Sequence, residues 1–158
     1  MSELYHHGIL GMKWGIRRYQ NPDGSLTARG KKKYSGSYRY TTKNGETADI
    51  LVSKGSNETV HTMYVNGKKA TIAYLDKNGS DMNINWISTK RKSQGKGYAQ
   101  TMMNHIIKYS KDKNNSTTIS LEVPDNDNNA LHIYEKYGFK KDDRRLGDYG
   151  LTGMKRKL

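Results

Sequence analysis

The stretch Gln94-Gly95-Lys96-Gly97-Tyr98-Ala99 carries the most information about the fold, because of the segments on either side of it. Met82 to Thr89 has the alternating pattern of a strand, and Gln100 to Tyr109 has apolar residues at helical spacing. Glycines between a strand and a helix allow backbone N–H groups to approach an anion closely. The unpaired N–H groups and the dipole at the helix N-terminus then favour negative charge. The stretch therefore predicts a phosphate-binding turn.

Two familiar phosphate-binding motifs do not fit this turn. Gly95-x-Gly97 lacks the third glycine of a dinucleotide fingerprint, and no acidic residue follows at the distance that contacts a ribose. A P-loop requires Gly-Lys-Ser/Thr after a longer glycine-spaced loop, which is also absent. Two interpretations remain: another class of phosphate site, or an ordinary strand–loop–helix with glycine in its turn.

A second strand–helix–strand pattern follows the first. Thr117 to Val123 is β-branched and alternating, which predicts a strand. Pro124 to Asn128 is a turn that contains a helix N-cap, and Ala130 to Tyr137 reads as a short helix ended by Gly138. Phe139-Lys140-Lys141 begins another strand.

These motifs resemble those of one enzyme family. Gln94 to Ala99 resembles the Gln/Arg-x-x-Gly-x-Gly/Ala signature with which the GCN5-related N-acetyltransferases (GNAT) hold the pyrophosphate of acetyl-CoA. The run from Leu121 to Phe139 resembles the second hallmark of this family, and Leu151 to Leu158 is similar to its closing strand. The resemblance covers about residues 48–158. It implies an α/β fold with a central mixed, mainly antiparallel sheet flanked by helices.

The resemblance also implies catalytic residues. Tyr134 occupies the position where the family commonly has its general acid, and a phenol can protonate a departing thiolate. Glu122, twelve residues earlier (134 − 122), is the implied general base, at a spacing found in relatives that acetylate protein N-termini. The alternatives are that Tyr134 is only a core residue and that Glu122 only faces solvent. Glu58, Asp76 and Asp81 are then the other candidate bases.

Acetyl-CoA is the implied co-substrate, and no metal is expected. The residues expected to contact it lie on the strand, the glycine turn and the second helix: Ile87, Thr89, Gln94, Gly95, Lys96, Gly97, Tyr98, Ala99 and Asn128. The family often has asparagine where this chain has Asp127. An aspartate can cap a helix, but its charge opposes that of the cofactor, so we expect no cofactor contact from Asp127.

A β meander is predicted ahead of the glycine turn. Its strands are expected at Thr47 to Ser53, Glu58 to Val65, Lys69 to Asp76 and Asp81 to Thr89, with hairpin turns at Asn66-Gly67 and Asn78-Gly79. No helical pattern is long enough for the two helices that the family usually places between its first two strands. The acceptor groove is therefore expected to be open, which favours a protein N-terminus or a lysine over an enclosed small amine. Trp86 is expected in the core, the alternative being the pantetheine channel.

Composition sets further limits. With 158 residues, 33% hydrophobic residues and a mean hydropathy of −0.99, we expect one domain with a segment outside its core. The absence of cysteine excludes disulfides and thiol nucleophiles. No apolar run has membrane-spanning length and no signal peptide is recognised, which predicts a cytoplasmic location and no membrane partner.

Residues 1–45 are interpreted as a basic, Gly- and aromatic-rich N-terminal arm, and residues 46–158 as the acetyltransferase domain. The arm has nine basic and two acidic residues (9 − 2 = +7) in a chain of net charge +13. Its segment from Glu3 to Thr27 resembles one that recurs in phage and prophage proteins of Gram-positive bacteria, which implies a phage origin and a docking role. The same resemblance implies a bacterial host cell and a virion as a candidate partner. A solvated arm that docks on an acidic protein surface, or that only aids solubility, is favoured slightly over nucleic-acid binding through the basic and aromatic residues.

The sequence thus predicts an N-acetyltransferase that transfers acetyl from acetyl-CoA to an amine. Direct attack in a ternary complex is expected, because no nucleophile for a covalent intermediate is evident. Two alternatives remain: a non-catalytic virion-associated or host-binding protein on the same scaffold, and a nucleic-acid-binding protein.

Overall fold

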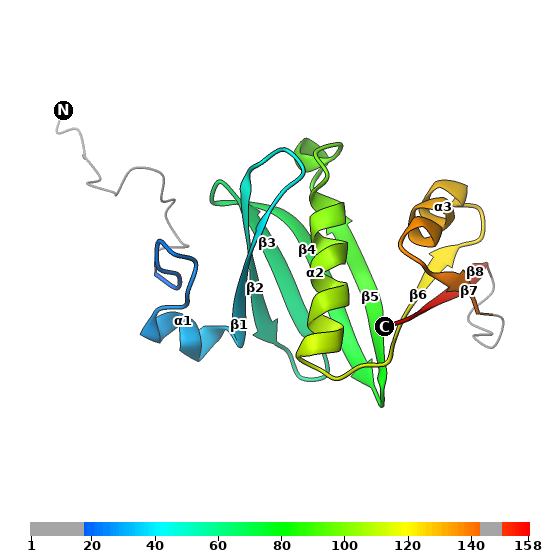
Figure 1. Ribbon diagram of the computed structural model, residues 1–158, viewed down its shortest axis with the longest axis horizontal. Coiled ribbons are helices and arrows are strands. Elements are labelled where there is room, and N and C mark those ends of the chain that lie inside the picture. Colours follow the sequence, from blue (N-terminus) through cyan, green and yellow to red (C-terminus); the bar gives the residue numbers. More distant parts are fainter. Residues whose placement is uncertain (1–17, 143–149) are drawn as a thin grey trace.

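The computed structural model describes residues 18–142 and 150–158, and in this part of the chain eight strands form one sheet (Figure 1). The strands lie in the order β1-β2-β3-β4-β5-β6-β8-β7, and all neighbours are antiparallel except β5 and β6. In chain order the elements are α1 (Ala28–Lys33), β1 (Gly36–Thr41), β2 (Thr47–Lys54), β3 (Thr59–Val65), β4 (Lys68–Asn78), β5 (Asp81–Thr89), a 3-10 turn η1 (Arg91–Ser93), α2 (Tyr98–Asp112), β6 (Thr118–Pro124), α3 (Asn128–Lys136), β7 (Lys140–Lys141) and β8 (Leu151–Lys157).

The predicted meander is confirmed by β2 to β5, which are consecutive antiparallel strands. Two-residue hairpin turns require a positive φ, which asparagine and glycine adopt more readily than other residues. Asn66 and Gly67 have φ of 50° and 71°, and Gly79 has φ of 61°. The Asn66-Gly67 turn is therefore confirmed, whereas the second turn is Gly79-Ser80, one residue later than predicted, because Asn78 still pairs with Asp81.

The predicted lack of helices on the acceptor side is also confirmed for the described residues. β2 and β3 are joined by residues 55–58, a tight turn closed by a hydrogen bond from Gly55 N to the carbonyl oxygen of Glu58 (2.7 Å). The six-residue α1 precedes β1, and no helix interrupts the run from β1 to β5. None of the helices in the described ranges is long and apolar enough to cross a membrane.

Part of the segment predicted as an arm belongs to this sheet. β1 pairs antiparallel with β2 along its full length. Ahead of it, the buried Gln20 side chain donates hydrogen bonds to the carbonyl oxygen of Gly24 (2.9 Å) and to Ser37 Oγ (3.1 Å). The boundary predicted at residue 45 thus lies in the turn of the β1–β2 hairpin. Residues 1–17, which carry most of the phage-like segment, lie outside the described residues.

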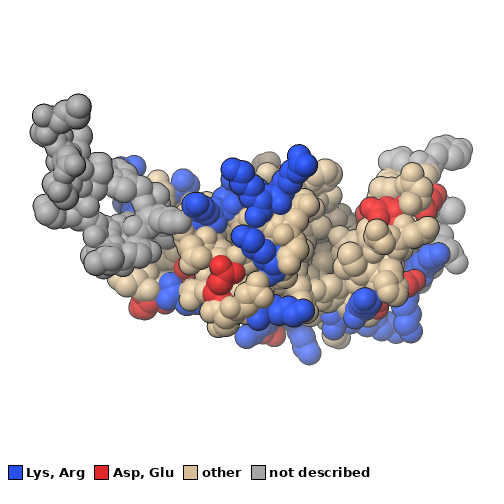
Figure 2. Space-filling model, turned by 90° about the horizontal axis from the view of Figure 1, so that it is seen from above, with Lys and Arg blue, Asp and Glu red and all other residues tan. Residues whose placement is uncertain are grey.

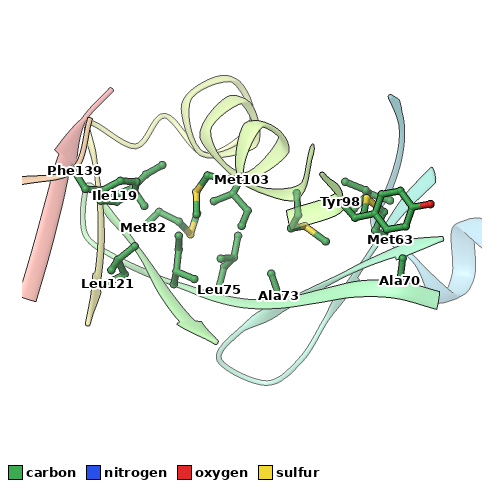
Figure 3. Close-up of a cluster of buried hydrophobic side chains, with 14 of the residues drawn as sticks. Met63, Ala70, Ala73, Leu75, Met82, Tyr98, Met103, Ile119, Leu121 and Phe139 are labelled. Carbon is green, nitrogen blue, oxygen red and sulfur yellow. The ribbon is translucent and has the colours of Figure 1, made fainter. Parts of the chain in front are cut away.

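The core lies between the sheet and α2, which crosses one face of it (Figures 1 and 3). Met102, Met103 and Ile106 of α2 are buried there, as their helical spacing predicts. Burying a side chain of this size contributes roughly 1.5–3 kcal/mol. Their partners on the sheet include Ile50, Met63, Ala73, Leu75, Met82, Ile119 and Leu121.

The prediction for Trp86 was wrong, because β5 contains a bulge. Leu75 of β4 lies opposite Ile84 and Tyr74 lies opposite Trp86, so Asn85 is an extra residue without a partner on β4. An extra residue shifts the alternation of side chains by one position. Trp86 therefore points away from the core and is 62% exposed, whereas Ile87 faces the same side as Ile84.

Four polar side chains form a hydrogen-bonded chain beneath α2. His61 Nδ1 lies 2.8 Å from His105 Nε2, His105 Nδ1 lies 2.8 Å from the Tyr40 hydroxyl, and His61 Nε2 lies 2.9 Å from Thr59 Oγ1. Each ring nitrogen thus has a partner when both imidazoles are neutral. Burial lowers the pKa of His61 to about 3, and burial followed by the charge of His61 lowers the pKa of His105 to about 2.

We expect the free energy of unfolding to fall as the pH is lowered from 7 to 5. Both native pKa values lie below the ordinary value of 6.5, so the unfolded chain binds more protons than the folded one below that pH. The contribution of the two neutral histidines to the free energy of unfolding is therefore fully present above pH 6.5. At pH 5 it is smaller by roughly 2 kcal/mol per ring. Urea denaturation at pH 7, 6 and 5 measures this slope.

A His132→Gln variant is the control, because His132 is exposed on α3. It should show the same dependence of stability on pH as the unmodified chain. Equal stabilities at pH 5 and pH 7 would contradict a buried neutral histidine pair.

Candidate functional site

β5 and β6 pair in parallel over four positions and then separate. The pairing runs from Asp81 opposite Thr118 to Ile84 opposite Leu121. Beyond this point β5 continues to pair with β4, and β6 continues to pair with β8. The sheet therefore divides into two halves that diverge between α2 and α3 (Figure 1).

A mainly apolar pocket of about 230 Å³ lies at this divergence. It is bounded by the end of β5, the first turns of α2 and one side of α3. The lining residues are Ile87, Thr89, Ala99, Met103, Ala130, Ile133, Tyr134 and Tyr137. The structure thus brings together three predicted cofactor residues, Ile87, Thr89 and Ala99, with the predicted general acid Tyr134.

The glycine turn lies at one end of this pocket. Gly95 and Gly97 have φ of 75° and 76°, the left-handed conformation that glycine tolerates without strain. Gly97 is the N-cap of α2, and no side chain caps this helix. The first N–H groups of α2 consequently have no partner within the helix and, with its dipole, create a site for an anion.

Basic side chains surround the glycine turn. Lys90, Arg91, Lys92 and Lys96 are exposed on the loop between β5 and α2. Figure 2, which views the molecule from this end, shows Lys and Arg side chains gathered here. The predicted rim residue Gln94 is tied back to the end of β5, where its Nε2 donates a hydrogen bond to the carbonyl oxygen of Thr89 (3.3 Å).

The Tyr98 side chain points away from the pocket. It is 5% exposed, and its hydroxyl donates a hydrogen bond to Glu46 Oε2 in the β1–β2 turn (2.6 Å). This hydrogen bond, together with burial, raises the pKa of Tyr98 to about 12. Only the backbone of Tyr98 is available to a ligand at the start of α2.

Tyr134 lies on α3 with its ring in the pocket wall. The ring packs edge-on against Phe139, with centroids 5.8 Å apart and planes at 72°. Burial, followed by the negative charge of Asp127, raises the pKa of the Tyr134 phenol. A phenol that keeps its proton at neutral pH is suited to act as a general acid.

Glu122 does not line this pocket. Its neighbours on β6, Leu121 and Val123, point into the core, so Glu122 projects from the opposite face of the sheet, where it is exposed. The structure therefore places the predicted acid and the predicted base on opposite faces, on either side of the diverging strands.

The other candidate bases lie farther from the divergence or are already engaged. Asp81 accepts hydrogen bonds from Thr118 Oγ1 (2.7 Å) and from Ser120 Oγ, in the part where β5 and β6 are still paired. Asp76 is opposite Asn83 on the neighbouring strand, and Glu58 closes the β2–β3 turn. Glu122 thus remains the acidic side chain on β6 beyond the paired region.

The start of α3 holds two further residues that the family resemblance singles out, Asp127 and Asn128. Asp127 is the N-cap, as expected, and its Oδ1 accepts a hydrogen bond from Ala130 N (2.9 Å). Asn128 is the first residue of the helix and is exposed, and it does not line the pocket. The described residues contain no group of His, Cys, Asp or Glu that is arranged to hold a metal ion.

Sequence reasoning missed the contribution of the β1–β2 turn to this site. Glu46 is 52 positions from Tyr98, so no local pattern links them. Lys43 in the same turn contacts the glycine turn as well: a Cβ built on Gly97 would lie 3.3 Å from Lys43 Cβ. Only the folded chain brings this turn to the N-terminus of α2.

A family model described as the acetyltransferase (GNAT) family matches residues 28–139, well over half of the chain. A second, described as a family of unknown function (DUF7211), matches residues 1–21. A search of curated proteins gave no match.

Several solved structures share the fold. PaiA N-acetyltransferase from Thermoplasma acidophilum in complex with coenzyme A has a TM-score of 0.58 and 18% identity over 65% of this chain and 62% of that one. The ribosomal-protein-S18-alanine N-acetyltransferase from Escherichia coli has a TM-score of 0.58 and 20% identity over 66% and 72%. A variant of the spermidine N-acetyltransferase from Vibrio cholerae has a TM-score of 0.57 and 24% identity over 65% of each chain. This chain therefore spans less than two thirds of the Thermoplasma protein.

We expect a Tyr98→Phe substitution to lower the free energy of unfolding by about 2 kcal/mol, because it removes a hydrogen bond to a carboxylate. Urea denaturation at pH 7 measures the change. Tyr64→Phe is the matched control, since no hydrogen bond of the Tyr64 hydroxyl is found among the described residues, and its stability should change by less than about 0.5 kcal/mol. Equal stabilities of the Tyr98→Phe protein and the unmodified chain would show that the contact with Glu46 contributes nothing.

Proposed function

The chain belongs to the acetyltransferase (GNAT) family, and from this premise we propose that it transfers the acetyl group of acetyl-CoA to an amine. The observation that carries the proposal is the uncapped N-terminus of α2 directly beside the apolar pocket between β5 and α3. Acetyl-CoA has a matching arrangement of parts, with an anionic pyrophosphate followed by a long, uncharged pantetheine arm.

The pyrophosphate would accept hydrogen bonds from backbone N–H groups between Gly95 and Ala99. Gln94 and Lys96 would assist at the rim. The pantetheine arm would then enter the pocket past Ile87 and Thr89, where the edge of β5 is released from β6. Its amide groups are suited to pair with that free strand edge, because unpaired backbone groups require partners.

The proposed reaction is direct attack of a neutral amine on the thioester carbonyl carbon. A C–N bond forms, the C–S bond breaks, and the departing thiolate takes the proton of the Tyr134 hydroxyl. The attacking nitrogen loses its own proton to a base. The chain has no cysteine to form an acyl-thiol intermediate, in keeping with a single direct transfer.

We propose Glu122 as that base, acting from the opposite face of the sheet. An amine that approaches from the face of Glu122 would meet the thioester between the diverging strands, while CoA occupies the face of α2 and α3. The absence of helices from β1 to β5 leaves the approach open within the described residues. An open approach favours a protein N-terminus or a lysine side chain as the acceptor.

Isothermal titration with acetyl-CoA tests where the cofactor binds. We expect the unmodified chain to bind, and a Gly97→Glu variant to lose more than tenfold in affinity, because the new carboxylate would occupy and repel the phosphate site. Gly79→Glu is the matched control: it also replaces a glycine of positive φ, but in the β4–β5 turn with open space around it. Equal losses in the two variants would contradict binding at the glycine turn.

Steady-state kinetics test the catalytic roles, with the best acceptor from a screen of peptide amines and polyamines. Tyr134→Phe should lower kcat about 100-fold with little change in KM for acetyl-CoA, because it removes a proton donor and retains the ring. Glu122→Gln should lower kcat and leave acetyl-CoA binding intact. Tyr64→Phe is the control for loss of a tyrosine hydroxyl elsewhere, and full activity of the Tyr134→Phe protein would exclude the acid role.

A further inference from the structure

We propose that the β1–β2 turn completes the pyrophosphate site and that Lys43 binds the pyrophosphate of CoA directly. This inference rests on the proposed function and adds to it a cation from a part of the chain outside the glycine signature. It also assigns Glu46 as a positioning residue, which holds the turn against α2.

Lys43 lies against the residue that begins α2. A Cβ built on Gly97 would be 3.3 Å from Lys43 Cβ and 3.9 Å from Lys43 Cδ, so the lysine stem runs past the N-cap. The residue is nevertheless exposed, which means that the stem is in contact while the ammonium group remains in solvent. An ammonium at the end of this stem is within reach of an anion bound to the first N–H groups of α2.

The turn that carries Lys43 is held rigidly. Thr42, which is 4% exposed, accepts a hydrogen bond from Gly45 N at its carbonyl oxygen (2.9 Å) and another from Glu46 N at Oγ1 (3.1 Å). The Tyr98 hydroxyl then fastens Glu46 to the first residue of α2. Because the turn is already fixed, only the end of the Lys43 side chain has to be ordered when an anion binds, which lowers the entropic cost of the contact.

The charges around the glycine turn agree with this role. The cations of the loop itself, Lys90 to Lys96, all lie on one connection between β5 and α2. Lys43 adds a positive charge from a separate hairpin on the other side of Gly97. The nearby Glu46 carboxylate is engaged by the Tyr98 hydroxyl and by Asn66 Nδ2 (3.3 Å). A pyrophosphate would therefore be contacted by backbone N–H groups and by cations from both the β5–α2 loop and the β1–β2 turn.

Isothermal titration of Lys43→Met with CoA and with 3′-dephospho-CoA tests the inference. Methionine retains most of the stem and removes the charge. The dissociation constant should rise about tenfold for both ligands, because both contain the pyrophosphate. Lys111→Met is the matched control. Lys111 is exposed in the last turn of α2, at the opposite end of the helix from the glycine turn, and its substitution changes the net charge by the same amount.

The outcomes separate this inference from the proposed function. Binding of CoA by the unmodified chain, with Lys43→Met and Lys111→Met both within twofold of it, would overturn the role of Lys43 alone. If Lys43→Met lowers the affinity for CoA but not for 3′-dephospho-CoA, the pyrophosphate assignment is overturned, and Lys43 instead contacts the 3′-phosphate. Failure of the folded, unmodified chain to bind CoA would overturn the proposed function, and this inference with it.

Discussion

The separation of β5 from β6 is the constraint on which the rest of the structure depends. Parallel pairing ends at Ile84 and Leu121, and the bulge at Asn85 follows immediately. A bulge increases the local twist and bends its strand, so β5 turns away from β6 directly after the last parallel pair. Each strand keeps its other neighbour, and the two halves of the sheet therefore remain stable while an opening forms between them.

The connection from β5 to α2 places the N-terminus of a helix beside this opening. A parallel pair of strands requires a crossover, and here the crossover is α2, whose buried face anchors it to the sheet. The N-terminus of α2 must then lie at the end where β5 finishes, beside the divergence. Two glycines of positive φ in the loop leave that helix end without a side-chain cap. The same topology thus supplies both an opening for an extended ligand and the electropositive helix end that we propose for its phosphates.

Local patterns predicted the strands and helices from β2 onward, but they predicted neither α1 and β1 nor the long-range contacts. Strand alternation, the Asn66-Gly67 turn and the glycine turn before α2 were predicted correctly because each depends on neighbouring residues. Trp86 was misplaced because a bulge is defined by the partner strand, and period-two counting assumes that none occurs. The contacts of Lys43 and Glu46 with the start of α2 link residues about fifty positions apart, and the His61–His105 pair links β3 with α2. No spacing in the sequence encodes those distances.

The sheet itself separates the two halves of the proposed chemistry. Tyr134 borders the pocket on the face of α2 and α3, where burial raises the pKa of its phenol, and Glu122 is exposed on the other face. In the proposed reaction the acid and the base therefore approach the thioester and the amine from opposite faces of the sheet. On opposite faces they can meet only through the thioester and the amine, in the gap between β5 and β6. The break in the parallel pairing would therefore provide the proposed cofactor slot and also the place where the proposed acid and base reach the substrates from the two faces.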